Sequence, residues 1–337
     1  MPARLLFVPV SGSAGSGEAQ RCTLLASALR ASAPGIESHF LLAEGAQDPG
    51  FPTLWLPASP TRSPGEVAAA IRAQRPAVVV FDGNARVESL SAAREAGARN
   101  VLLSSRPSAR RRGLRGRRMA LIDEHWFVGA DLLGAPGWRE RWARWRYPRV
   151  AIRRYATFFA PPAELEPLRA RFHLGDAPYA VVSTGGGRHA GAADRFGAAA
   201  TLLARDGLAT LAIATPAQAP AFDVGALPNA ELMALLAGAR VAVLAGGSLL
   251  VQALALGTPV VASPLQAEQA KRVRWLAQAG AVRLADDGQP ATLATMAQSL
   301  AGDDAARAAL REGARALGLH NGLDEAVERL RTLASYS

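Results

Sequence analysis

The protein has 337 residues, 50% of them hydrophobic and 20% charged, which is the composition of a folded chain and a length that suits two domains. Its apolar runs have the length of strands, far below the roughly 20 residues of a membrane-spanning helix, and the single cysteine, Cys22, excludes an intrachain disulfide. The net charge is +10, and this excess lies within residues 106–154, where 14 arginines face four acidic residues. No signal-peptide pattern precedes the first glycine-rich run, so we expect a cytoplasmic protein.

The first part of the chain alternates short apolar runs with helical patterns. A strand at residues 4–10 leads into a glycine- and serine-rich run at 11–17, and the apolar spacing then predicts a helix over 18–31. The next predicted strands are 38–42, 77–82 and 100–104, and the predicted helices between them are 64–74 and 87–97. Strands separated by helices predict a parallel sheet with helices on both faces.

The basic segment that follows consists of two arginine-rich runs. Arg106–Arg118 contains seven arginines with glycines among them, which predicts a mobile loop that closes over an anionic substrate. Trp138–Arg154 contains seven more arginines and places Trp138, Trp142 and Trp145 on one face of a helix. Tryptophan beside arginine is typical of a surface that binds an anionic membrane or a lipid-linked acceptor, which would place the protein at the inner membrane face. Packing of the tryptophans against the domain is the open alternative. We do not expect nucleic acid as a partner, because no recognisable nucleic-acid-binding fold accompanies the patch.

The second part of the chain repeats the alternation of strands and helices. The predicted strands are 179–183, 208–214, 240–245, 259–263 and 281–284, and the predicted helices are 192–206, 229–237, 249–256, 267–278, 292–317 and 323–333. An Ala-Pro-Pro run at 160–162 indicates a linker. We therefore expect an α/β protein with an N-terminal domain at residues 1–160 and a C-terminal domain at 165–337.

Three glycine-rich loops join a strand to a helix, at residues 11–17, 184–187 and 246–248. Glycine there lets backbone amides approach a phosphate, and the following helix adds unpaired N–H groups. The first loop lacks both the G-x-G-x-x-G spacing and the lysine of a P-loop, which argues against a nicotinamide enzyme and a P-loop NTPase. A single loop of this kind is often structural, but three of them in two halves favour a phosphate-bearing ligand held between the halves.

Two stretches resemble known families. Residues 15–29, GSGEAQRCTLLASAL, resemble the opening motif G-x-G-H-x-x-R-C-x-x-L-A-x-x-L of the UDP-sugar hydrolases of the pseudaminic acid pathway (PseG-like). Residues 227–280 resemble the C-terminal domain of the lipid II-forming N-acetylglucosaminyltransferases (MurG-like, glycosyltransferase family 28), most clearly in AGGS at 245–248, QALALGTP at 252–259 and PLQAEQ at 264–269. These resemblances imply the GT-B architecture, two Rossmann-like domains whose parallel sheets face a central cleft. The N-terminal domain would bind the acceptor and the C-terminal domain the nucleotide-sugar.

The resemblance also implies that the nucleotide-sugar is a UDP-sugar and which residues contact it. Residues 246–248 would hold the diphosphate, residue 252 would face the ribose, and residues 229 and 232 would lie near the base. The full predicted binding set is Gly17, Thr184, Gly185, Gly186, His189, Asn229, Leu232, Gly246, Gly247, Ser248, Gln252 and Gln269.

Two positions depart from the family pattern. Gln252 stands where an acidic residue usually binds the ribose, and its amide can still accept and donate hydrogen bonds. Glu18 stands where a histidine serves as the catalytic base. A carboxylate can accept a proton if partial burial raises its pKa, so Glu18 is the candidate base, but an acid in the first turn of a helix can also serve only to complement the dipole.

Other polar residues leave two interpretations open. His189 follows the loop at 184–187 and either contacts phosphate or is solvated. Asp82 ends a strand before a glycine and is either functional or part of an ordinary turn. Asp123, Glu124 and His125 precede a strand-like run at 126–128. They either form a second polar group at the end of the N-terminal sheet or satisfy a buried turn.

The favoured function is a metal-independent glycosyltransferase that moves a sugar from a nucleotide-diphosphate donor to an anionic or lipid-linked acceptor. A nucleotide-sugar hydrolase of the PseG-like type and a non-catalytic GT-B binding module are the alternatives. No metal-ligand spacing and no Asp-x-Asp pair occur, so we expect no metal and no cofactor, with the nucleotide-sugar as substrate.

Overall fold

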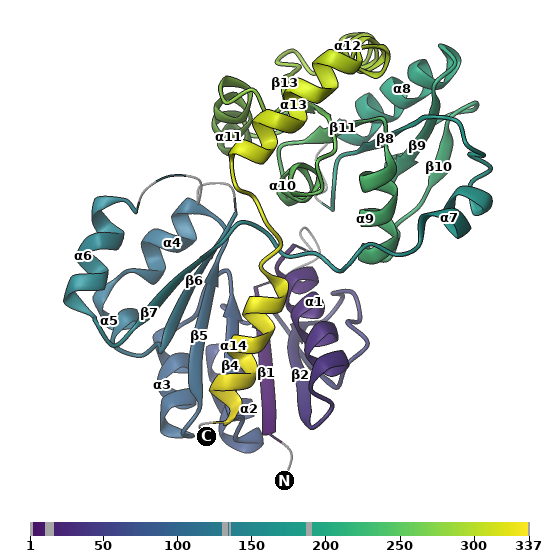
Figure 1. Ribbon diagram of the computed structural model, residues 1–337. Coiled ribbons are helices and arrows are strands. Elements are labelled where there is room, and N and C mark those ends of the chain that lie inside the picture. Colours follow the sequence, from purple (N-terminus) through teal and green to yellow (C-terminus); the bar gives the residue numbers. More distant parts are fainter. Residues whose placement is uncertain (1–2, 11–16, 130–133, 135, 187–190, 336–337) are drawn as a thin grey trace. The chain divides into compact units, whose positions relative to one another are not determined.

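The computed structural model describes residues 3–10, 17–129, 134, 136–186 and 191–335. The chain divides into two compact units: the first comprises Met1–Phe158 together with Gly322–Ser337, and the second comprises Phe159–Asn321 (Figure 1). Within the described residues, no helix is long and apolar enough to cross a membrane.

The first unit is built on a seven-stranded parallel sheet with the strand order β3-β2-β1-β4-β5-β6-β7. Its strands are β1 (Ala3–Pro9), β2 (Ile36–Ala43), β3 (Thr53–Leu56), β4 (Val78–Asp82), β5 (Arg99–Ser104), β6 (Glu124–Val128) and β7 (Ala151–Tyr155). All pairings are parallel, for example Phe7 with Phe40 and with Val80. Side chains of β1 alternate between two cores, Leu5 and Phe7 in one and Leu6 and Val8 in the other, as a sheet covered on both faces requires.

Helices cover both faces of this sheet (Figure 1). Its helices are α1 (Gly17–Ser32), α2 (Pro64–Gln74), α3 (Val87–Glu95), α4 (Pro107–Gly113), α5 (Gly116–Met119), α6 (Trp138–Arg146) and α14 (Leu323–Ser335). α1 and α14 share one core with the sheet, and α2, α3, α5 and α6 share the other.

The second unit contains a six-stranded parallel sheet with the order β10-β9-β8-β11-β12-β13. The strands are β8 (Tyr179–Ser183), β9 (Ala209–Ile213), β10 (Phe222–Val224), β11 (Val241–Ala245), β12 (Val260–Ser263) and β13 (Arg283–Leu284), and the helices are α7 (Leu165–Arg171), α8 (Ala192–Arg205), α9 (Asn229–Gly238), α10 (Ser248–Ala255), α11 (Ala267–Gln278), α12 (Pro290–Gly302) and α13 (Asp304–Ala316). β8 and β11 are buried along their whole length, which explains their continuous apolar sequences.

The C-terminal helix corrects the predicted domain organisation. Their order in the chain predicts that residues 322–337 belong to the C-terminal domain, but they belong to the first unit. α14 packs on α1 and on the central strands through residues spaced on one helical face, namely Leu323, Ala326, Val327, Leu330, Leu333 and Ala334. Its position is also fixed by Glu124 of β6, which is 1% exposed and accepts a hydrogen bond from Arg329 Nε at 2.5 Å.

Several local predictions also need correction. The run at 106–118, predicted as a loop, forms α4 and α5, because Pro107 suits the first helical turn and Ala109 and Met119 are buried. The single helix predicted at 292–317 is two helices that meet at Asp303, which caps α13 by accepting from Ala306 N. Three short strands, β3, β7 and β10, were not predicted.

Candidate functional site

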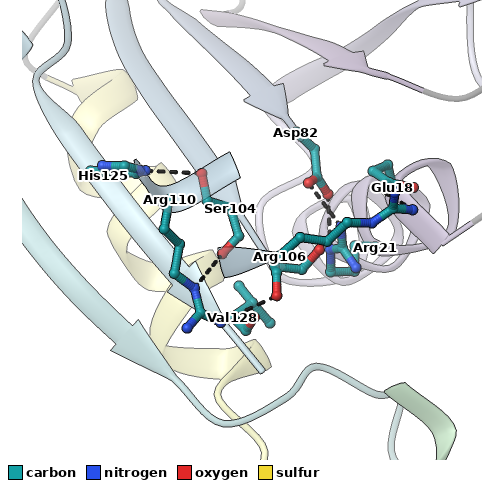
Figure 2. A network of polar contacts seen from close by, with 9 residues as sticks. Glu18, Arg21, Asp82, Ser104, Arg106, Arg110, His125 and Val128 are labelled. Carbon is teal, nitrogen blue, oxygen red and sulfur yellow. Dashed lines mark hydrogen bonds and ion pairs between the residues drawn. The ribbon is translucent and has the colours of Figure 1, made fainter. Parts of the chain in front are cut away.

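A buried ion pair lies where β4 ends and α1 begins (Figure 2). Arg21, one turn into α1, donates from Nε to Asp82 Oδ2 and from Nη2 to Asp82 Oδ1, both at 2.9 Å, so the guanidinium binds both carboxylate oxygens. Nη2 also donates to Ser105 Oγ at 3.2 Å, just beyond β5. The pair therefore ties α1 to the carboxyl ends of two neighbouring strands, β4 and β5.

The burial of Asp82 changes its acidity. Asp82 is fully buried, and burial raises its pKa to about 6, against the opposing effect of Arg21. Asp82 is thus ionised at neutral pH and paired with Arg21, and it takes up a proton in mildly acidic solution.

Glu18, the candidate base, lies beside this pair. It is 8% exposed, and Arg106 Nη2 lies 3.5 Å from its Oε1. Gly83 has a φ of +94°, and a Cβ there would lie 3.3 Å from Glu18 Cγ, so glycine allows Glu18 to lie against the chain that leaves β4. A carboxylate placed at the carboxyl edge of a parallel sheet can accept a proton from a hydroxyl group or water bound there.

α4 is held against the same edge by Arg110. Its guanidinium donates to the carbonyl oxygens of Ser104, Ser105 and Val128 at 3.3, 3.2 and 3.1 Å, at the ends of β5 and β6. These bonds satisfy carbonyl groups that the strands leave unpaired and fix the start of the segment that carries Arg106.

His125 belongs to the packing of α4. Burial lowers its pKa to about 3, so the ring is neutral, and its Nε2 hydrogen-bonds with Ser104 Oγ at 2.9 Å. A Cβ on Gly113 would lie only 2.3 Å from His125 Cε1, so α4 can approach β6 only with glycine at that position.

The proposed polar group Asp123, Glu124 and His125 is not one cluster. These residues stand at the amino end of β6, where Asp123 Oδ2 accepts from Asn100 N at 2.8 Å. Glu124 accepts from Trp126 Nε1 and Arg153 Nε at 2.7 and 3.0 Å. Each side chain thus has a structural partner, which favours the interpretation as a satisfied buried turn.

In the second unit, the predicted residues follow the carboxyl ends of neighbouring strands. Ser183 of β8 and Leu244 of β11 are register partners, so the loops after these two strands leave the sheet side by side. Gly246 is buried, and a Cβ on it would lie 2.9 Å from Gln269 Cβ and 2.7 Å from Val273 Cγ2. Glycine therefore lets α11 cross close to the start of α10.

Hydrogen bonds within this unit already engage several of the predicted side chains. Gln269 Oε1 accepts from Leu265 N at 2.8 Å, and Asn229 Oδ1 accepts from Ala160 N at 2.7 Å. Gln252 is buried on α10. The other predicted binding residues of the unit lie partly or fully exposed after their strands or at helix starts, namely Thr184, Gly185, Gly186, Leu232, Gly247 and Ser248. Their contacts with a nucleotide-sugar stay predictions.

Some predicted residues lie at or beyond the described ranges. Gly17 is the exposed first residue of α1. The rest of the first glycine-rich loop, residues 11–16, lies outside the described residues, as do Gly187 at the end of the second loop and His189. Within the described part of the chain, no group of three or more His, Cys, Asp or Glu side chains could hold a metal ion.

The sequence pattern does not reveal the partners of Glu18 and Asp82. Arg21 lies in the motif at 15–29 and Asp82 ends a strand, but their pairing depends on the approach of α1 to β4. Arg106 was assigned only to a substrate loop, whereas it forms an ion pair with Glu18.

The tryptophan-bearing helix α6 is exposed. The side chains of Trp138, Trp142 and Trp145 are 66%, 47% and 76% exposed, which excludes the alternative that all three pack into the domain. Trp138 and Trp142 line a pocket of about 480 Å³ together with Arg111, Leu114, Arg115 and Arg139.

Comparison of the structure with solved structures identifies the fold. The spinosyn forosaminyltransferase SpnP is 17% identical with a TM-score of 0.67, over 99% of this chain and 100% of that chain. A UDP-glucosyltransferase from Polygonum tinctorium is 14% identical with a TM-score of 0.67, over 99% of each chain, and the spinosyn rhamnosyltransferase SpnG is 18% identical with a TM-score of 0.64, over 97% of this chain and 100% of that chain. The chain has the GT-B fold.

Sequence comparison alone does not reach this result, because no family model and no curated protein matches the chain. At 14–18% identity, these likenesses show the GT-B fold and leave the reaction to be inferred from the site residues. The GT-B fold confirms the predicted architecture of two Rossmann-like α/β units.

Proposed function

We propose that the protein is a glycosyltransferase that takes a sugar from a nucleotide-diphosphate donor. The observation that carries the proposal is the buried side chain of Glu18, which lies against Gly83 and beside Arg106 where β4 ends and α1 begins. Three solved structures of the same fold support it: SpnP is a forosaminyltransferase, SpnG is a rhamnosyltransferase, and UGT2 of Phytolacca americana was solved in complex with UDP-2fluoro-glucose.

The donor would bind to the second unit. The loop at Gly246 and Gly247 precedes α10, whose first N–H groups and positive dipole end suit a diphosphate. As the bond between the sugar's anomeric carbon and the diphosphate oxygen breaks, the bonding electrons move onto the diphosphate, and these groups stabilise the new charge.

The acceptor would bind to the first unit. Its hydroxyl oxygen forms the new bond to the anomeric carbon and loses its proton to Glu18. Arg106 lies beside Glu18, and Arg21 with Asp82 holds α1 in place.

A panel of nucleotide-sugars tests the proposal. The purified protein is incubated with each donor, with and without candidate acceptors, and released nucleoside diphosphate is measured. Release that an acceptor accelerates supports a transferase. Release that no acceptor changes identifies a hydrolase, binding without release identifies a non-catalytic module, and either result contradicts the proposal.

We further propose that the acceptor is presented at an anionic membrane. Trp138, Trp142 and Trp145 expose large apolar rings on α6, and the arginines around them, including Arg111, Arg115 and Arg139, supply positive charge. Exposed tryptophan suits the boundary between headgroups and acyl chains, and arginine attracts anionic headgroups.

Co-sedimentation with lipid vesicles tests this surface. Wild type should bind vesicles that contain phosphatidylglycerol and not vesicles of phosphatidylcholine alone. Changing the three tryptophans of α6 to Ala should abolish binding without affecting folding, since all three are exposed. Changing Trp55 and Trp275, each 40% exposed, to Ala is the matched control and should leave binding intact. Unchanged binding by the α6 variant would refute the membrane proposal.

A further inference from the structure

A basic pocket lies beside the first helical turns of α2 and α3. Its volume is about 530 Å³, which is in the range of small-molecule sites and exceeds the size of a single phosphate group. The residues that line it are Thr61, Arg62, Pro64, Arg86, Val87, Glu88 and Arg118. Three of these seven residues are arginines, and Glu88 is the one acidic residue among them.

Main-chain carbonyl groups hold two of these arginines in place. Arg86 donates from Nε to Thr61 O at 2.8 Å, and Arg118 donates from Nε to Ala85 O at 2.9 Å. Arg118 also donates from Nη1 to Arg112 O at 3.2 Å. A guanidinium has five N–H groups, so each arginine keeps further donors for a ligand. Because Nε is fixed, these donors are already oriented.

The arginines of the pocket outnumber its carboxylates among the described residues. Among the described residues, none of Arg62, Arg86 and Arg118 forms an ion pair, although Glu88 lines the same pocket. The pKa of Arg118 is lowered, first by burial and then by the charges of Arg115, Arg112 and Arg86. Several like charges held together favour a bound anion, which would relieve their mutual repulsion.

The pocket is connected to Glu18 through one short segment. Residues 83–86 join β4 to α3. Gly83, at the start of this segment, lies against Glu18. At its end, Arg86 lines the pocket and the carbonyl oxygen of Ala85 accepts from Arg118. A molecule anchored in the pocket would therefore lie on the same edge of the sheet as the carboxylate that we propose as the base.

We propose that this pocket binds the anionic group, a phosphate or a carboxylate, of the sugar acceptor. Arg62, Arg86 and Arg118 would donate charge-assisted hydrogen bonds to its oxygens, and Thr61 would add a hydroxyl. The assignment to an acceptor depends on the proposed function, whereas the anion site itself does not.

Calorimetric titration with inorganic phosphate and, separately, with acetate tests the anion site and distinguishes the two chemistries. Arg62 and Arg86 are exposed, so the double variant Arg62→Gln/Arg86→Gln should fold normally. We expect it to weaken binding of the preferred anion at least about tenfold, and Glu88→Gln to strengthen it.

The control removes the same charge from the other ends of the same two helices. Arg72 of α2 and Arg94 of α3 are also exposed, and Arg72→Gln/Arg94→Gln should bind the anion as wild type does. Equal weakening in both double variants would show a general charge effect and overturn the proposal, as would wild-type protein that binds neither anion. Sugar transfer is not measured, so failure of the proposed reaction would leave this result unchanged.

Discussion

The buried ion pair of Arg21 and Asp82 predicts that removing either side chain greatly lowers the free energy of unfolding. Arg21→Met leaves a fully buried carboxylate without its guanidinium, and breaking a buried pair in this way costs about 3–5 kcal/mol. Urea unfolding followed by circular dichroism measures the change. Arg72→Gln, which removes an exposed pair with Glu95, is the control and should cost at most about 1 kcal/mol. A loss for Arg21→Met no larger than that of the control would contradict the importance of the pair.

The raised pKa of Asp82 predicts how stability changes with pH. The carboxyl group has a pKa of about 6 in the folded protein and 3.8 in the reference state, so the folded state binds the proton more tightly. The stability that this proton contributes is complete below about pH 3.8 and is lost as the pH rises through about 6. The free energy of unfolding of wild type, relative to Asp82→Asn, should thus fall across this window, by at most about 1.4 kcal/mol per pH unit. A flat difference would show that Asp82 titrates elsewhere.

Substitution of Glu18 should lower the rate of catalysis without changing the affinity for the donor. Glu18→Gln keeps the shape of the residue but cannot accept a proton, so kcat should fall by about 10²–10⁴. The Kd for the nucleoside diphosphate should stay unchanged, because the donor is proposed to bind the other unit. Full activity of the variant would remove Glu18 from the reaction and leave it as an acid that complements the start of α1.

At this scale, the sequence predicted single residues better than pairs of residues. Glu18 and Asp82 could be recognised because each occupies an informative place, the first turn of a helix or the end of a strand. Arg21 and Arg86 could not be assigned, because their partners lie 61 and 25 residues away in the chain and come close only through the folding of the sheet. Arginine in an arginine-rich chain gives no signal of its own.

At the scale of elements, the loop before α10 allows a test of the donor site. Gly247 has an ordinary backbone conformation, and a Cβ there would meet no atom within 4 Å. Gly247→Ala should therefore leave stability within about 0.5 kcal/mol of wild type. If the diphosphate occupies that space, the methyl group should weaken nucleoside diphosphate binding by about tenfold or more, measured by calorimetry.

A matched glycine separates this effect from substitution in general. Gly302, at the end of α12, also has open space around a Cβ and lies in the same unit, so Gly302→Ala should bind the diphosphate as wild type does. Gly246→Ala should instead destabilise the unit by about 1–3 kcal/mol, because its Cβ would overlap Val273 and Gln269. Unchanged diphosphate affinity in Gly247→Ala would move the donor away from this loop.

The spacing of apolar residues predicts most helices and strands correctly. It fails for segments whose structure depends on contacts with residues far away in the chain. Long apolar or amphipathic runs such as β4, β11 and α8 could be predicted directly from their spacing. The segment of α4 and α5 has glycines and many charges, and its helices depend on Arg110 bonding to the ends of β5 and β6 and on Gly113 fitting over His125. Those contacts cannot be seen in the run itself.

At the scale of the whole molecule, the packing of the last helix, α14, on the first unit could not be predicted from the order of elements along the chain. The amphipathic pattern of 323–333 predicts a helix and its buried face but not the sheet that covers it. The surface that receives it is made of Leu25 and Leu29 of α1 and of β1 and β4, far away in sequence. The core of the first unit therefore contains residues from two distant parts of the chain. We expect this unit to reach its full stability only when α14 is packed on it.

This dependence predicts which unit a core substitution in α14 destabilises. Leu330 is fully buried in the first unit, and Leu330→Ala should cost about 2–5 kcal/mol. Leu300 of α12 is equally buried in the second unit and provides the matched substitution. Hydrogen exchange followed by mass spectrometry should show that Leu330→Ala accelerates exchange in β1 and β4, whereas Leu300→Ala accelerates it in β8 and β11. If Leu330→Ala instead left β1 and β4 protected and opened the second unit, the assignment of α14 to the first unit would be wrong, and the chain would be divided in sequence order.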